Sequence, residues 1–101
     1  MLSQEQFTRI AKALADPRRF EILEMIAADS EVACKAMVAE FPVAQATISH
    51  HLKELTTAGL VEVRREGQSG HYRVRPGVLD DYLAEVAKRL RASTPESVSI
   101  N

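Results

Sequence analysis

Apolar side chains recur at helical spacing in the first third of the chain and predict two helices. Ser3 and Gln6 have the spacing of a capping box, which places the start of the first helix at Ser3. Asp16 and Pro17 are typical of the cap and first turn of a second helix. The apolar faces are formed by Phe7, Ile10, Ala11 and Leu14 in the first helix and by Phe20, Leu23, Ile26 and Ala27 in the second.

Two further helices follow, joined by a very short connection. The first begins near Cys34 and runs to Phe41, because Pro42 disfavours helix in the residue before it. The second starts about three residues later and has its natural stop at Gly59. The apolar residues expected to point inward are Ala36, Met37 and Phe41 in the first and Ile48, Leu52 and Leu55 in the second. Two helices joined in this way predict a helix-turn-helix unit.

After Gly59 the pattern changes from helical spacing to alternation. Val61 and Val63 alternate with polar residues, Tyr72 and Val74 do so again, and residues 66–70 between them are rich in turn formers. This predicts a β-hairpin. Beyond Pro76 and Gly77, a last helix is predicted from the apolar stripe of Val78, Leu79, Tyr82, Leu83, Val86 and Leu90. The predicted fold is mainly α with a small β-hairpin, the arrangement of a winged helix-turn-helix domain.

Length and composition limit the number of domains and the cellular location that we expect. The 101 residues favour one domain, which we expect to span residues 1–92, with a flexible polar tail at 93–101. Cys34 is the only cysteine, so no internal disulfide can form. No signal peptide and no apolar run long enough to cross a membrane is recognisable. These features predict a cytoplasmic protein without a membrane partner.

The formal net charge of -1 argues mildly against a nucleic-acid-binding domain. The distribution of charge argues the other way. Residues 44–75 carry five basic and three acidic side chains, whereas residues 1–43 carry five basic and seven acidic ones. A positive excess around the predicted helix-turn-helix and hairpin indicates a partner for that region.

His50 and His51 lie side by side in the second helix of the helix-turn-helix unit. Metal ligands on one helix face need a spacing of about four residues, whereas adjacent residues point about 100° apart. No zinc-binding pattern or catalytic signature accompanies the pair, so we expect neither a metal site nor an enzyme. His50 is then a candidate DNA contact, and His51 a residue packed against the scaffold.

The stretches "ALADPRRFEIL", "TISHHLKELTTAGLVEVRREGQ" and "HYRV" resemble the ArsR/SmtB family of bacterial winged-helix repressors. The resemblance covers about residues 5–92, and its most specific part runs from Thr47 to Gly67. It implies a homodimer that binds double-stranded operator DNA and leaves it when an inducer binds. It also implies that the first and last helices build the dimer interface.

The sequence departs from the family pattern in three places, two of which concern the metal sites through which some members sense an inducer. The two cysteine positions of the family's soft-metal motif fall on Ala33 and Lys35, and Cys34 lies between them. The last helix offers acidic residues but no histidine for the family's zinc site; these residues are Asp80, Asp81 and Glu85. Pro42 replaces the usual glycine of the turn, so the turn must differ locally. We therefore expect no metal and no cofactor, and the inducer stays unidentified.

The predicted DNA contacts fall in two groups. A recognition helix at about 44–57 would enter the major groove with its N-terminal part, and a basic wing at about 61–75 would hold the backbone. The predicted contacts are Gln45, Ala46, Thr47, Ser49, His50 and Lys53 in the helix and Arg64, Arg65, Gln68 and Arg73 in the wing. The alternative is an ordinary solvated face. Arg18 and Arg19 are further candidates for a phosphate contact.

The apolar helical stripes exceed what one small core needs, which favours a dimer interface. The residues assigned to it are Phe7, Ile10, Leu14, Leu79, Tyr82, Leu83, Val86 and Leu90. Cys34 has a helix start and Lys35 beside it, both of which raise thiol reactivity. It is either a thiol switch or an inert half-buried side chain. The predicted function is a homodimeric repressor of an inverted-repeat operator; the alternatives are a thiol-responsive repressor and a protein-interaction module that does not bind DNA.

Overall fold

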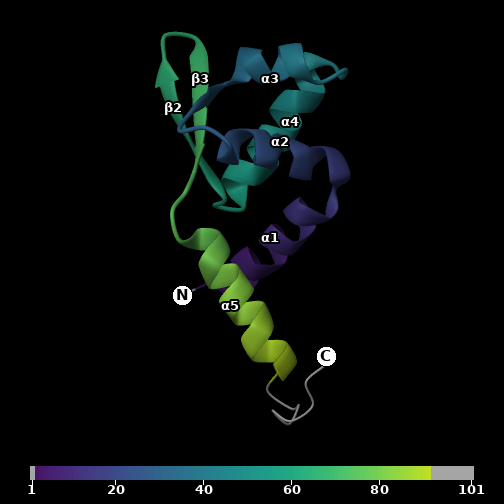
Figure 1. Cartoon of the computed structure of the whole chain (residues 1–101), viewed down its shortest axis with the longest axis vertical. Helices are drawn as coiled ribbons and strands as arrows, with labels where there is room; N and C mark the ends of the chain where they lie inside the picture. The colour runs from purple at the N-terminus through teal and green to yellow at the C-terminus, as the bar shows by residue number, and fades with distance from the viewer. Residues whose placement is uncertain (1, 92–101) are drawn as a thin grey trace.

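The computed structural model describes residues 2–91, and it contains five helices and a small antiparallel sheet within that range (Figure 1). The predicted tail, together with residue 92 of the predicted domain, lies outside the described residues. The elements are α1 (Gln4–Ala15), α2 (Pro17–Ala27), β1 (Val32–Ala33), α3 (Cys34–Glu40), α4 (Gln45–Thr57), β2 (Val61–Glu66), β3 (Ser69–Val74) and α5 (Val78–Arg91). The order confirms the predicted winged helix-turn-helix architecture.

The starts of α1 and α2 follow from their caps. The Ser3 hydroxyl accepts the backbone N–H of Gln6 at 3.1 Å, and the Asp16 carboxylate accepts that of Arg19 at 2.9 Å. The Gln6 side chain does not complete the capping box. Its amide instead donates to the carbonyl of Ala58 at 3.2 Å, which ties α1 to the C-terminal end of α4.

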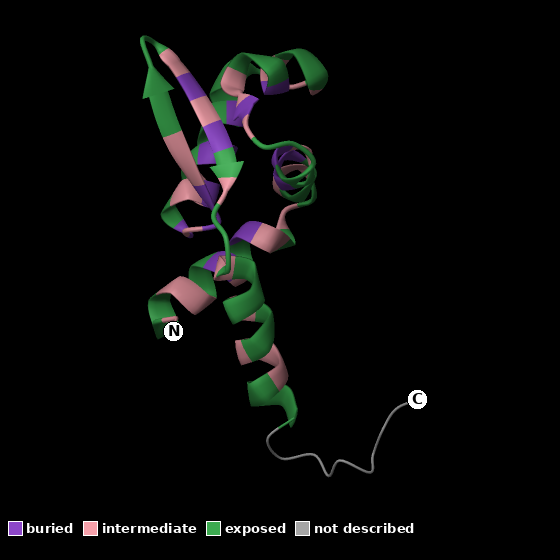
Figure 2. Ribbon diagram, turned by 60° about the vertical axis from the view of Figure 1, so that its left-hand side comes forward, coloured by how far each residue is buried: buried purple, intermediate pink, exposed green. Residues whose placement is uncertain are grey.

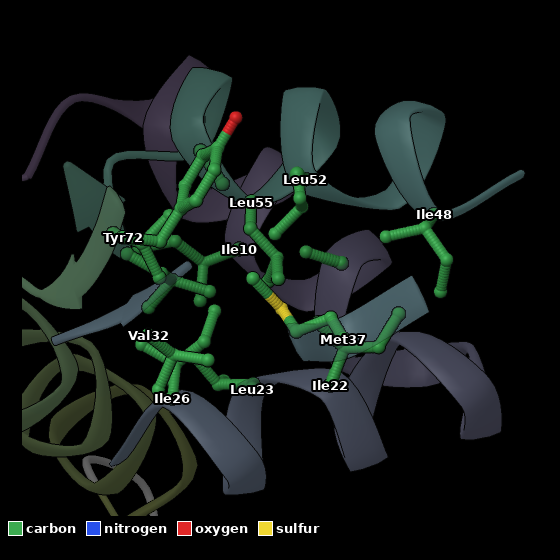
Figure 3. Packing of buried hydrophobic residues seen from close by; sticks show 14 residues of the cluster. Ile10, Ile22, Leu23, Ile26, Val32, Met37, Ile48, Leu52, Leu55 and Tyr72 are labelled. Atoms are coloured by element: carbon green, nitrogen blue, oxygen red, sulfur yellow. The ribbon is translucent and has the colours of Figure 1, made fainter. Parts of the chain in front are cut away.

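The core lies between α2, the helix-turn-helix and the inner face of the sheet (Figure 3). Its largest fully buried side chains are Ile10, Ile22, Ile26, Met37, Ile48, Leu52, Leu55, Leu60 and Val61. At about 25 cal/mol per Å² of apolar area removed from water, burial of such side chains dominates the stabilisation of a small domain. The core holds α4 by its apolar side and leaves the opposite side of that helix in solvent.

The predicted inward faces of α2 and α3 are partly wrong. Phe20 is 44% exposed and Ala27 is exposed, whereas Ile22 is completely buried. Two residues advance a helix by about 200°, so Phe20 and Ile22 cannot both face the core. Ala36 is likewise exposed, because Met37 takes the buried position of α3.

The sheet has one strand more than predicted. β1 is only two residues long and pairs with β3 through Val32↔Tyr72 and Ala33↔His71, giving the strand order β1-β3-β2. The hairpin is also tighter than expected, because β2 and β3 pair up to Glu66↔Ser69. Its two-residue turn begins with Gly67, whose φ of 63° lies in the left-handed region that favours glycine.

The helix-turn-helix connection consists of residues 41–44. Pro42 is accommodated without a left-handed residue, since no non-glycine residue in the described range has a positive φ. The C-cap of α3 is Phe41, whose N–H bonds back to the carbonyl of Met37 at 3.1 Å. The expected local difference is thus a tight turn across Pro42, in which the N–H of Val43 donates to the carbonyl of Phe41 at 2.8 Å.

Candidate DNA-binding surface

A groove of about 560 Å³ runs between the start of α3, the exposed side of α4 and the inner face of the hairpin. The α4 side is a row of residues four apart on one helix face, Gln45, Ser49 and Lys53, which line the groove. Arg65 and Gln68 line it from the hairpin. Helix and wing therefore line one groove, in which these polar side chains lie beside the apolar side chains of Val38 and Val63.

Three cations line this groove: Lys35, Lys53 and Arg65. No carboxylate between residues 2 and 91 lies within ion-pair distance of any of them. They come from α3, α4 and β2, so only folding brings them together. Unpaired cations on one groove favour binding of a polyanion. Lys35 was missing from the predicted DNA contacts, because nothing in its local pattern places it in the same groove as Lys53.

Gly70 makes room for Arg65. The two residues are partners in the β2–β3 ladder, and a Cβ at Gly70 would lie 3.1 Å from the Arg65 guanidinium and 3.2 Å from the Tyr72 ring. Without that Cβ, the guanidinium lies across the strand on the groove side. The sequence offers this signal only as an isolated glycine in a strand, which often marks a close approach of another group.

Arg64 and Arg73 point away from the groove, because side chains alternate along a strand. Arg64 donates to both carboxylate oxygens of Glu31, at 2.8 and 3.0 Å, and to Glu66 at 3.3 Å; Arg73 pairs with Glu62. The Arg64 hydrogen bonds hold the pKa of Glu31 below its usual range. Both arginines were predicted to contact DNA, but the structure places them in ion pairs on the outer face of the wing.

The six predicted residues of α4 are all solvent-exposed: Gln45, Ala46, Thr47, Ser49, His50 and Lys53. Ile48, Leu52 and Leu55 hold the other side of the helix in the core. The N-cap residue is Ala44, so no side chain caps the N-terminus of α4. Its first N–H groups and the positive end of the helix dipole are thus available to an anion such as a phosphate.

His51 is confirmed as a scaffold residue. It is 7% exposed, and its Nδ1 accepts a hydrogen bond from Arg19 Nε at 3.3 Å. Arg18 is held nearby, with its guanidinium 5.5 Å from the Phe41 ring centroid and in an ion pair with Glu21 at 3.0 Å. Both arginines at the start of α2 therefore already have partners within the protomer.

Cys34 is a half-buried free thiol on the wall of the groove. Within the part of the chain that the structure describes, no three histidine, cysteine, aspartate or glutamate side chains gather closely enough to hold a metal ion. No helix in that part is long and apolar enough to span a membrane.

A second surface lies at the other end of the molecule, where α5 packs beside α1 (Figure 1). No residue of α5 is buried, and the helix projects from the body (Figure 2). Leu79, Leu83 and Leu90 are 37%, 53% and 73% exposed. The Phe7 and Tyr82 rings join the two helices with centroids 5.1 Å apart. An apolar stripe left in solvent indicates a docking surface.

The other residues predicted for a dimer interface divide between this surface and the core. Leu14 and Tyr82 are partly buried against the core, and Val86 is half-buried. Ile10 is completely buried inside the protomer, so it offers no surface to a partner and its assignment was wrong.

Comparison with known proteins decides the family. A family model described as a helix-turn-helix domain matches residues 14–64. The chain is 33% identical over 82 residues to the arsenical resistance operon repressor of Staphylococcus aureus, with 81% of this chain and 78% of that protein covered. The chain belongs to the ArsR/SmtB family. It is therefore a winged helix-turn-helix transcriptional regulator, as the sequence resemblance predicted.

Solved structures of ArsR/SmtB type share the fold. An ArsR-like transcriptional regulator from Rhodococcus sp. RHA1 superimposes with a TM-score of 0.74 at 27% identity, covering 87% of this chain and 81% of that one. The homodimeric winged helix-turn-helix DNA-binding domain from Mycobacterium bovis has a TM-score of 0.68 at 34% identity, covering 90% of this chain and 87% of that one. The second of these proteins is described as a DNA-binding domain.

Proposed function

We propose that the chain is a homodimeric, cytoplasmic repressor that binds an inverted-repeat DNA operator and releases it in response to a signal. The observation that carries this proposal is the groove between α4 and the wing, where three cations without an ion-pair partner among residues 2–91 flank an exposed helix face. A groove of this composition matches the phosphate backbone of DNA.

The apolar surface of α1 and α5 supports the homodimer. It leaves leucines in solvent at the end of the molecule away from α3 and the hairpin. The similar domain from Mycobacterium bovis is homodimeric. In a symmetric pair, two α4 helices would meet successive major grooves about 34 Å apart, which matches an inverted repeat.

Within α4 we assign base contacts to the exposed N-terminal residues. Gln45 can pair with adenine N6 and N7, the Ser49 hydroxyl can bind either kind of base pair, and His50 can donate to a guanine acceptor. The Ala46 and Thr47 methyl groups can contact a thymine methyl. Lys35, Lys53 and Arg65 are assigned to phosphates, and Gln68 to the wing's contact with the backbone.

Gln45→Ala and His50→Ala should each weaken operator binding by about 1–3 kcal/mol and leave binding to random DNA nearly unchanged. The reason is that a base contact contributes only on the correct sequence. Fluorescence anisotropy with a duplex that the protein has enriched from a random library, and with a scrambled duplex of equal length, measures both affinities. Equal losses on the two duplexes would assign these residues to the backbone instead.

A thiol-responsive repressor is the second candidate, because Cys34 lies on the wall of the same groove as the three cations. A bulky or charged modification of the thiol would stand where we place DNA. Mild oxidation should therefore weaken operator binding of the wild type and leave Cys34→Ser unaffected, as measured with the enriched duplex. The same loss in both proteins would remove Cys34 from the response.

A further inference from the structure

One side chain joins three helices behind the recognition surface. Arg19 in α2 donates from Nε to His51 Nδ1 in α4 at 3.3 Å and from Nη1 to the carbonyl of Lys12 in α1 at 3.5 Å. Its backbone N–H is held by the carboxylate of Asp16 at 2.9 Å. Among residues 2–91, the bond to His51 is the one side-chain hydrogen bond that joins residues 45–57 of α4 to another element.

This bond requires a neutral imidazole. Arginine is only a donor, so His51 Nδ1 must be unprotonated and the ring proton must reside on Nε2. A proton on Nδ1 removes the acceptor and places a second cation beside the Arg19 guanidinium. Because His51 is almost completely buried, water cannot screen this repulsion as it does at the surface.

The charged groups around His51 shift its pKa in opposite directions. Burial lowers the pKa of His51 below its usual value of 6.5, the Asp16 carboxylate acts against this shift, and Arg19, His50 and Arg18 add to it. Asp16 itself stays ionised in mild acid, because the Arg19 N–H lowers the pKa of that carboxyl. The contact is thus fully present above about pH 6.5 and is lost as the pH falls through the lowered value.

We propose that Arg19 and His51 are positioning residues that hold α4 for DNA binding, and that protonation of His51 breaks their contact and lowers operator affinity. This inference rests on the proposed function, because it takes the exposed side of α4 as the DNA-reading side. His51 lies on the buried side of the same helical turn as His50. A change in the Arg19 contact therefore moves the residues that meet the bases.

The other two histidines lie where they cannot weaken operator binding in the way proposed for His51. His50 is exposed on the proposed DNA surface, where added positive charge would strengthen rather than weaken binding to any DNA. His71 lies on the outer face of the wing, within 4.0 Å of Glu31 and 3.6 Å of Glu66, and has no contact with α4. A loss of operator affinity in acid is therefore the signature of His51.

The test compares binding to the enriched duplex at about pH 7.5 and about pH 5.5, at constant ionic strength. A single proton changes affinity by at most about tenfold per pH unit, and because the pKa of His51 lies below 6.5 we expect the wild type to lose affinity at the lower pH by no more than about tenfold. In His51→Asn, Oδ1 stands near the former Nδ1 and accepts the arginine N–H at either pH. That variant should change by less than about twofold, whereas the control His71→Asn should keep the wild-type loss.

A second pair of measurements keeps the inference testable if His51→Asn folds poorly. Arg19→Gln keeps a donor but removes the cation, so its pH-dependent loss should shrink while its affinity at about pH 7.5 is retained. Nitrogen NMR shifts of the free wild-type protein should show His51 as the Nε2-protonated tautomer at neutral pH. Equal acid losses in wild type and His51→Asn, a rise in wild-type affinity, or an Nδ1-protonated His51 would each overturn the inference. Failure to enrich any duplex would instead contradict the proposed function, and the tautomer measurement would still decide the Arg19 contact.

Discussion

Leu83→Asp is expected to convert the protein to monomers and to weaken operator binding by about 100-fold or more. Leu83 is 53% exposed in the middle of the apolar stripe of α5. An aspartate there would have to enter an apolar interface without a partner charge, which is strongly unfavourable. A monomer carries one recognition helix, so it loses the gain of about 10²–10⁴ that two linked half-site contacts provide.

Sedimentation velocity of the free protein measures the first effect, and anisotropy with the enriched duplex measures the second. Lys88→Asp is the matched control, because it adds the same side chain about 140° around α5, away from the stripe. We expect that variant to remain a dimer with nearly normal affinity. An intact dimer of Leu83→Asp would show that the interface lies elsewhere.

Arg65→Ala is expected to weaken binding to every DNA sequence by about tenfold, which is the size of one charge-assisted hydrogen bond to a phosphate. Arg65 lines the groove without a carboxylate partner among the described residues. Its loss should also reduce the salt dependence of binding by about one unit of slope, because one fewer counterion is released. Titrations at several salt concentrations, with enriched and scrambled duplexes, measure both effects.

Arg64→Ala is the control for this prediction. The two arginines are adjacent in β2, yet Arg64 donates to Glu31 and Glu66 on the outer face of the wing. Exposed ion pairs of this kind contribute little to stability, so the variant should fold normally and lose less than about twofold in DNA affinity. Equal losses for Arg64→Ala and Arg65→Ala would refute the division of the wing into two faces.

This division could have been predicted in part from the sequence. Alternation places Arg65 on the face of Val61 and Val63 and puts Arg64 on the opposite face. Alternation does not reveal which carboxylate pairs with Arg64. Glu31 precedes β1, and the strand itself has only two residues, too few for any periodicity to appear. The ion pair with Arg64 joins residues 33 positions apart and depends on the folded sheet.

For the helices, too, the sequence pattern predicts the element but not what each face contacts. Helical spacing located α1, α2, α4 and α5, and the caps at Ser3 and Asp16 placed two of their starts. An apolar stripe does not say whether it faces its own core or a partner. Ile10 and Leu83 belong to equally regular stripes, but α1 packs against α2 and α4, which leaves Ile10 buried and Leu83 exposed. Lys35 is a comparable case, because its place in the groove depends on how α3 packs against α4.

The central claim is that two copies of this chain bind one operator through paired α4 helices. Sedimentation velocity of the wild-type protein with the enriched duplex tests it most directly. The account predicts a dimer in the absence of DNA and a complex of two chains on one duplex, with half-sites about one helical turn apart. A single chain bound to the duplex with full affinity, or a dimer that forms no complex with any DNA, would contradict it.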